Sequence, residues 1–517
     1  MSSGADDDDD DVYPTGRIDN ALSLKPMILS ITLRFNDVLD ASRLHAALCT
    51  LLSTGDWRRL GGRLRKPLAS SPSQTLEVHV PRAFTASRPP VAFSHEDLFD
   101  TPVAQHPLGK DLPDVDGTAT ATAGLFHPGE HFRDFAAAPA FPDTIDGFVD
   151  RDVPVVSLRV TNFQDATLVA VGVPHLLFDA MALGELLRAW SLVLAGRQDE
   201  VPRVVGARSD ILYDAADPAR RQPGEEPWVL RDVYLVGFSF LLFVVRFLWG
   251  VLTERTIEGR VVFMPKQVLA KLRASALADI ADGPSATASW VSEGDVLFAW
   301  VSRVVSLGQG RWPRPLNGIN AVNLRGRLPE TTAPSGAGGA VYAGNFVTSS
   351  FLPVSVAEAR GPLGLVAAKY RAALTAQMTP QQALWTLRAS RTAVDKGQDA
   401  SVVCGAPPTG ELFSMTNWLK ADIAGSAEFA PAVLLPAGRE DGQGGGGNVS
   451  KKQKKHVPGR IVYVHAQLHA QSATIRNTLG VIGKDQDGNV WMQGFFPPRT
   501  WDVVRKELDE LNEKYAE

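Results

Sequence analysis

The pattern of hydrophobic and polar positions predicts alternating strands and helices along most of the chain. Residues 22–35 alternate enough to indicate a strand, and residues 155–160 and 167–173 are predicted to form two more. Residues 41–52 place four leucines on one helical face. A second region with the same character starts near residue 257, with predicted helices at 267–278, 292–306, 356–378 (broken near Gly361) and from 500 onward. This alternation is typical of an α/β fold.

The third predicted strand leads into a turn that carries a histidine and an aspartate. Pro174 disfavours helix for the residue before it, so the strand delivers His175 to a strand-to-helix turn. Asp179 is a suitable N-cap for the apolar helix that follows. A histidine in such a turn can have a pKa near neutrality and accept a proton from a substrate. Taken alone, the H-x-x-x-D spacing also fits a capping or surface histidine.

Polar side chains recur on one face of a predicted strand at 319–328. With a two-residue period, Asn323, Arg325 and Arg327 share that face, and their apolar neighbours indicate burial. A buried arginine requires a carboxylate or several carbonyl groups. We expect Arg325, and Arg327 as the second candidate, to pair with Asp179 and so hold the turn. The alternative is a purely structural polar strand.

Composition and charge exclude several classes of function. The chain has 517 residues, is 44% hydrophobic and carries a net charge of −5, which gives no electrostatic basis for binding nucleic acid. Its two cysteines, Cys49 and Cys404, cannot form a disulfide framework or a four-cysteine zinc site, and this low number suits a reducing compartment. The acidic residues 1–12 are predicted to form a disordered tail, and no secretory signal is recognisable there.

Residues 233–252 form the longest apolar run, V-Y-L-V-G-F-S-F-L-L-F-V-V-R-F-L-W-G-V-L. The run is long enough to span a bilayer, but Arg246 would be costly at its centre. A single span would also separate the two halves of the chain. Three arrangements remain open: a buried helix, a helix lying on a membrane surface, or a shallow hairpin that turns near Gly237.

An ordered set of segments resembles the BAHD acyltransferases, a family with the chloramphenicol-acetyltransferase fold, and most of all its fungal branch of the trichothecene acetyltransferase kind. The resemblance runs from about residue 13 to the end. Its segments are D-W-R-R-L-G-G-R-L-R (56–65), V-P-H-L-L-F-D-A (173–180), V-S-E-G-D-V-L-F-A-W (291–300), A-V-N-L-R-G-R-L-P (321–329), Y-A-G-N-F (342–346) and S-M-T-N-W (414–418).

The resemblance implies an α/β enzyme with two chloramphenicol-acetyltransferase-like domains, each a mixed β-sheet flanked by helices, and a channel at their interface. Residues 13–225 would form the N-terminal domain and residues 257–517 the C-terminal domain. Residues 226–256 would be an apolar crossover that contains the possible membrane-contact helix. Residues 436–458, rich in Gly and Lys, are predicted to be a flexible insertion.

The implied activity is transfer of an acyl group, such as acetyl, from acyl-CoA to a hydroxyl of a specialised metabolite, in preference to an amine. His175 would be the general base and Asp179 its structural support, while Thr416 and Trp418 would line the channel and donate to the oxyanion. Acyl-CoA would be a co-substrate, with no metal and no permanently bound cofactor. We expect a cytoplasmic monomer whose partners are acyl-CoA and a small acceptor, with peripheral membrane contact through 233–252 as a further possibility.

Two departures from the family pattern bear on function. The D-F-G-W-G segment of the family is replaced near residues 426–431, where only Phe429 is retained and Glu428 stands in place of the acid. Pro174 occupies the position of a second histidine in peptide-synthetase condensation domains, which argues against that role. The alternatives are an acyltransferase that uses a carrier-protein thioester and an inactive, membrane-associated binding protein on the same scaffold.

Overall fold

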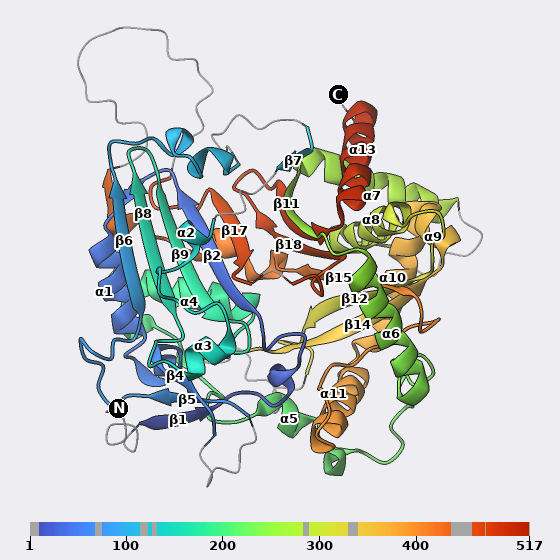
Figure 1. The fold of residues 1–517 in the computed structure, drawn as a ribbon, viewed down its shortest axis with the longest axis horizontal. Helices are drawn as coiled ribbons and strands as arrows, with labels where there is room; N and C mark the ends of the chain where they lie inside the picture. Colours follow the sequence, from blue (N-terminus) through green and yellow to red (C-terminus); the bar gives the residue numbers. More distant parts are fainter. Residues whose placement is uncertain are drawn as a thin grey trace, which may run out of the picture.

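Two β-sheets lie side by side, each packed against its own helices (Figure 1). The structure is a computed structural model that describes residues 10–67, 75–113, 122–126, 132–282, 289–328, 340–435, 457–470 and 472–515. The mixed sheets flanked by helices confirm the expected α/β class.

The first sheet is built mainly from the N-terminal half of the chain. Its helices are α1 (Ala41–Leu51) and α4 (Ala180–Leu194), whose leucine-rich faces join the core of this half. Both helices begin at an aspartate whose side chain accepts a backbone N–H, as expected for an N-cap. The strand order is β17 (Tyr463–Leu468), β2 (Ile28–Phe35), β9 (Thr167–Pro174), β8 (Ser157–Phe163) and β6 (Ala92–Leu98).

The second sheet has seven strands and a separate core. Its order is β14 (Val347–Val354), β12 (Leu316–Asn323), β15 (Glu411–Asn417), β18 (Thr478–Lys484), β19 (Val490–Phe496), β11 (Glu258–Met264) and β7 (Gly124–Phe126). The helices that share its core are α7 (Lys266–Ala281), α8 (Glu293–Gly308), α9 (Val356–Arg360), α10 (Leu363–Gln377) and α13 (Pro498–Tyr515). The break predicted near Gly361 separates α9 from α10.

The remaining elements are short or peripheral, apart from α6 and α11. A three-stranded sheet contains β1 (Asp11–Pro14), β5 (Glu77–Val80) and β4 (Arg63–Arg65). The others are β3 (Val38–Leu39), β10 (Arg203–Val204), β13 (Ala340–Val341), β16 (Val433–Leu435), α2 (Arg133–Ala136), α3 (Ile145–Val149), α5 (Ile211–Ala215), α6 (Gly237–Thr253), α11 (Pro380–Asp395) and α12 (Ile423–Ser426).

Each half of the chain contributes one strand to the other half's sheet. Strand β17 pairs with β2 of the N-terminal half, and β7 pairs with β11 of the C-terminal half. The division into 13–225 and 257–517 therefore stays a prediction as a domain boundary, because the sheets do not follow it strictly. The exchanged strands tie the two halves together through backbone hydrogen bonds.

The structure describes only part of the two segments that we predicted to be disordered or flexible. Residues 10–12 are not a disordered tail: Asp11 and Val12 begin β1, and the carboxylate of Asp10 lies 2.8 Å from the guanidinium of Arg88. Residues 1–9, and residues 436–456 of the predicted insertion, lie outside the described residues.

Most of the apolar run at 233–252 forms one surface helix, α6, which begins at Gly237 and continues unbroken to Thr253. The residues before Gly237 pair with the segment around Cys404 and do not form a second apolar arm beside α6, so the hairpin is excluded. Phe243 is the only buried residue of α6, so the buried helix is excluded as well. Within the part of the chain that the structure describes, every helix is too short or too polar to traverse a bilayer.

Residues of the segment D-W-R-R-L-G-G-R (56–63) have packing and hydrogen-bonding roles in the fold. Trp57 is buried and its indole N–H donates to the carbonyl of Pro202 at 2.9 Å. Gly62 lies so close to β5 that an added Cβ would be 2.4 Å from the side chain of Val78, so a larger residue would force this segment away from the strand. The fully buried Arg63 donates to two carbonyls, those of Gly61 and Pro89.

Phe429, the retained residue of the altered family segment, is a core residue. It is fully buried, with ring centroids 5.4 Å from Phe35 and 4.7 Å from Trp190. We expect Phe429→Ala to lower the free energy of unfolding by about 3–5 kcal/mol, because it leaves a cavity between these rings. Urea denaturation measures the change. Glu428→Ala is the matched control, since Glu428 is exposed and its ion pair with Arg460 is worth less than about 1 kcal/mol. Equal effects of the two variants would contradict this assignment.

Candidate active site

His175 lies directly after β9, with its backbone held from both halves of the chain. Its N–H donates to the carbonyl of Met27 at 2.9 Å, just before β2. Its carbonyl accepts a hydrogen bond of 3.0 Å from Nδ2 of Asn345, which belongs to the C-terminal half. The turn between β9 and α4 is thus fixed at the boundary of the two sheets.

The carboxylate of Asp179 is buried and accepts three hydrogen bonds. Oδ1 accepts the N–H of Ala182 at 2.9 Å and caps α4. Oδ2 accepts a guanidinium N–H of Arg325 at 2.7 Å and the backbone N–H of Phe346 at 2.9 Å. Because both oxygens are occupied by donors in a buried site, the carboxylate is held in one orientation.

The guanidinium of Arg325 completes this arrangement by donating to three acceptors besides Asp179. One terminal nitrogen donates to Asp179 and to Oδ1 of Asn323, and the other donates to the carbonyls of Tyr342 and Gly344 at 3.1 and 2.7 Å. A single charge thereby joins the turn after β9 to two segments of the C-terminal half. Arg325 therefore forms the ion pair with Asp179, and it is the arginine that we named first as the partner from the sequence.

The continuous strand predicted at 319–328 is wrong in its second half. Strand β12 ends at Asn323, and the next residues turn, with Gly326 at φ +71° and the N–H of Arg327 donating to the carbonyl of Leu324. The turn breaks the two-residue period, so Arg325 and Arg327 do not share a strand face. Arg325 reaches Asp179, whereas Arg327 lines the neighbouring cavity and forms no ion pair with Asp179.

A cavity of about 1120 Å³ lies between the two sheets and contains the predicted site residues. His175, Asp179, Arg325, Arg327, Thr416 and Trp418 all line it. Thr416 and Trp418 lie at the end of β15, and the indole N–H of Trp418 donates to the hydroxyl oxygen of Thr416 at 3.0 Å. The indole donor is therefore already used, which leaves the hydroxyl proton of Thr416 as the donor of this pair.

Burial sets the protonation state of His175. It lowers the pKa of the imidazole below its ordinary value of 6.5, while the residue's own backbone and the charge of Asp179 oppose the shift. Nδ1 is buried without a hydrogen-bond partner among the described residues. A neutral imidazole at the wall of a cavity is in the form that accepts a proton.

Asn345 is a site residue whose role the sequence did not reveal. It is almost fully buried and links the carbonyl of His175 to a second buried acid, Asp19. Burial, and next the charge of Asp210, raise the pKa of Asp19 to about 8. The G-N pair in Y-A-G-N-F was the only sequence signal for this contact.

The cavity has two chemically different ends, separated along β15. Strand β15 lines the cavity from Ser414 to Asn417, over about 10 Å. Around its last residue lie Trp290, Arg273 and Lys420, and the side chain of Asn417 contacts Gly294 at the start of α8. In the described ranges neither Arg273 nor Lys420 is paired with a carboxylate, so this end is basic.

The opposite end of the cavity is apolar. Leu468, Ile475 and Phe495 line it, and Phe495 pairs with Thr478 at the start of β18, which runs parallel to β15. The sequence did not reveal either end, because their residues come from segments that are distant along the chain.

The described residues contain no group of three or more His, Cys, Asp or Glu side chains that could hold a metal ion. The side chains that line the cavity include a histidine, a threonine hydroxyl and basic groups at one end.

Comparison with known proteins shows relatives along the whole chain. The chain is 32% identical to acetyltransferase BOT5 of Botryotinia fuckeliana, covering 97% of this chain and 91% of the relative. It is also 32% identical to O-acetyltransferase PaAT-2 of Phomopsis amygdali, with 97% and 98% covered. No family model matches the chain.

Among solved structures, the chain resembles F. sporotrichioides TRI101 complexed with coenzyme A and T-2. The TM-score is 0.63 at 14% identity, and the match covers 97% of this chain and 98% of that one. This likeness shows the fold, which is the two-domain chloramphenicol-acetyltransferase-like arrangement that the sequence led us to expect.

The triply bonded carboxylate makes a testable contribution to stability. Asp179→Ala leaves the guanidinium of Arg325 and the N–H of Phe346 without their acceptor, and it removes the cap of α4. We expect a loss of about 3–5 kcal/mol in the free energy of unfolding, measured by urea denaturation. Arg327→Ala is the control and should change stability by less than about 0.5 kcal/mol. A small effect of Asp179→Ala would show that the buried pair does not support the turn.

Proposed function

The chain belongs to the BAHD-type fungal acetyltransferases, and on that premise we propose that it transfers an acyl group, such as acetyl, from acyl-CoA to a hydroxyl of a specialised metabolite. The observation that carries the proposal is that a half-buried histidine with a lowered pKa and a threonine hydroxyl line one cavity between the two sheets. This cavity is not filled by side chains at His175, which supports an enzyme over an inactive scaffold.

The donor enters at the basic end of the cavity. Coenzyme A carries several phosphate charges, and Arg273 and Lys420 are cations without a carboxylate partner among the described residues. The guanidinium groups of Arg273 and Arg371 lie 5.8 and 4.9 Å from the ring centroid of Trp290, which is exposed and offers a flat surface for a ring system. The apolar end, lined by Leu468 and Ile475, accepts the less polar acceptor.

The reaction needs one base and one oxyanion donor from the chain. His175 takes the proton of the acceptor hydroxyl as the oxygen attacks the thioester carbonyl. Because Nδ1 is buried, Nε2 is the atom that accepts this proton. The hydroxyl of Thr416, oriented by Trp418, donates to the tetrahedral oxyanion. Collapse breaks the carbon–sulfur bond, and the proton on His175 passes to the departing CoA thiolate.

Asp179 supports this chemistry without transferring a proton itself. Its oxygens accept from Ala182, Arg325 and Phe346, so it has no free lone pair directed at a substrate proton in this arrangement. It positions the turn, and the turn positions His175. The monomeric state and the cytoplasmic location stay predictions from the sequence.

The first test is thermal stabilisation of the purified protein by coenzyme A, acetyl-CoA and longer acyl-CoAs. A ligand that binds only the folded state raises the melting temperature in a saturable way. Stabilisation supports a thioester site, and the preferred acyl length identifies the donor class. A complete lack of stabilisation would favour a carrier-protein donor or a scaffold that has lost catalysis.

His175→Ala separates catalysis from binding. We expect acyl transfer to fall about 10²–10⁴-fold, because no other base reaches the acceptor in the proposed geometry. Release of the CoA thiol with a panel of hydroxylated apolar metabolites measures the rate. Acetyl-CoA should still stabilise the variant, which controls for folding. A rate equal to that of the wild type would overturn the role of His175.

The pH dependence follows from the lowered pKa of His175. The neutral base predominates above that pKa, and the pKa of the folded protein lies below the ordinary value of 6.5. The value of kcat/KM should therefore be flat through neutral pH and fall only below about pH 6.5 as the imidazole is protonated. A rate profile from acidic to neutral pH measures this limb. An acidic limb centred above the ordinary histidine pKa would contradict the assignment.

A further inference from the structure

Helix α6 carries an unusual concentration of exposed apolar side chains. Arg246 is the only charged residue of α6. The exposed large hydrophobic residues elsewhere in the described chain are scattered among many elements. Large exposed apolar patches on proteins mark interaction sites. The exposed set consists of Val236, Phe238, Phe240, Leu241, Leu242, Val245, Leu248, Trp249 and Leu252.

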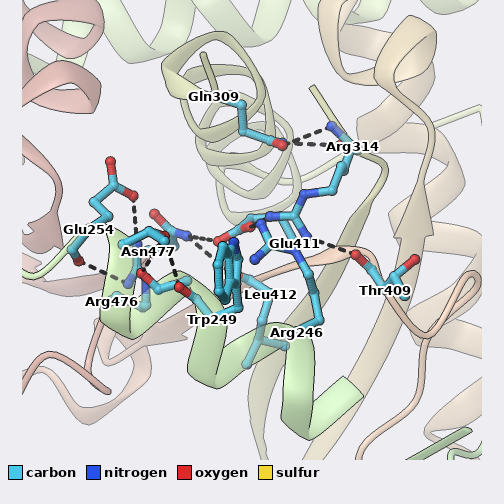
Figure 2. Close-up of polar contacts among 12 residues, drawn as sticks. Arg246, Trp249, Glu254, Gln309, Arg314, Thr409, Glu411, Leu412, Arg476 and Asn477 are labelled. Atoms are coloured by element: carbon cyan, nitrogen blue, oxygen red, sulfur yellow. Dashed lines mark hydrogen bonds and ion pairs between the residues drawn. The ribbon is translucent and has the colours of Figure 1, made fainter. Parts of the chain in front are cut away.

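The inner side of α6 is fastened to the C-terminal half by ion pairs (Figure 2). The guanidinium of Arg246 points toward Glu411 at the start of β15, 3.9 Å away. At the end of the helix, Glu254 pairs with Arg476 at 2.6 Å and with Arg499 at 2.8 Å. These contacts turn the only charge of the helix toward the protein and leave an uncharged outer face.

The C-terminal end of α6 has a basic and aromatic rim. Arg255 follows the helix and is exposed. Arg499, bound to Glu254, also contacts Gly310, so the loop that carries Arg311 and Trp312 lies beside the helix end. Trp312 is 81% exposed, and the guanidinium of Arg311 lies 5.5 Å from its ring centroid. Exposed tryptophan beside arginine is typical of groups that sit at lipid headgroups.

We propose that α6 binds the surface of a bilayer that contains anionic lipids. The uncharged outer face would enter the boundary between headgroups and acyl chains, and Arg255 and Arg311 would meet lipid phosphates. The helix has 17 residues and lies along the protein, which suits binding in the plane of the membrane. A second copy of the chain would explain the apolar face but not the exposed arginines beside it.

The position of α6 links this surface to the cavity, on the premise of the proposed function. Arg476, which pairs with Glu254, is adjacent to Ile475 at the apolar end of the cavity. Glu411, which faces Arg246, starts the strand β15 that leads to Thr416. A protein bound through α6 would hold the acceptor end near lipid, which indicates an acceptor that partitions into membranes.

The test is co-sedimentation of the full chain with phosphatidylcholine vesicles, with and without phosphatidylserine. We expect binding that phosphatidylserine strengthens and salt weakens. The variant with Phe238→Ser, Leu241→Ser and Trp249→Ser should bind about tenfold or more weakly, since three exposed apolar side chains no longer enter the bilayer. The matched control replaces Leu22, Phe99 and Leu434, which are exposed outside α6 and outside the loop that carries Trp312, by serine and should bind as the wild type does.

The other outcomes of this test decide whether a bilayer or a second copy of the chain covers the outer face of α6. If the wild type stays in solution with both kinds of vesicle, the proposal is wrong. If it instead forms a dimer in analytical ultracentrifugation that the three α6 substitutions dissociate, the face is an interface between copies. Thermal stabilisation by acetyl-CoA should be unchanged in the α6 variant, so loss of lipid binding and loss of the transferase site are told apart.

Discussion

The buried carboxylate of Asp179 is the contact on which the arrangement of this site depends. A charge with so little exposure is stable only if donors surround it, and here they come from α4, from Arg325 and from the backbone of Phe346. Two of the three donors belong to the C-terminal half. The turn that carries His175 therefore has its observed shape only when the two halves are docked, which couples assembly of the cavity to folding.

The same coupling recurs in the backbone. His175 is held by the carbonyl of Met27 on one side and the amide of Asn345 on the other, and each sheet contains a strand from the opposite half. An interface stabilised in this way can enclose a large cavity without the halves separating. Rigid halves with a cavity between them suit a reaction in which two substrates must meet in a defined orientation.

Several family segments owe their form to structural constraints and not to chemistry. In V-S-E-G-D, Ser292 and Asp295 form a capping box at the start of α8, and Asp295 is further bound by Arg371. In D-W-R-R-L-G-G-R, Gly62 permits close approach to β5, and Arg63 donates hydrogen bonds to backbone carbonyls. His175 and Thr416, by contrast, line the cavity, where they can contact ligands.

The sequence by itself determined what depends on neighbours within a few residues. The helical faces of α1 and α4, the cap at Asp179, the break between α9 and α10 and the apolar character of α6 are all local patterns. The need of a buried arginine for a carboxylate also made Asp179 and Arg325 a reasonable pair. Tertiary structure alone decided the rest, because the decisive contacts join residues far apart, such as the 146 positions between Asp179 and Arg325. It ended β12 at Asn323, brought Asn345 to His175, exchanged β7 and β17, and left the outer face of α6 uncovered. These outcomes depend on which surfaces meet when the halves dock, and periodicity along one segment contains no information about its distant partner.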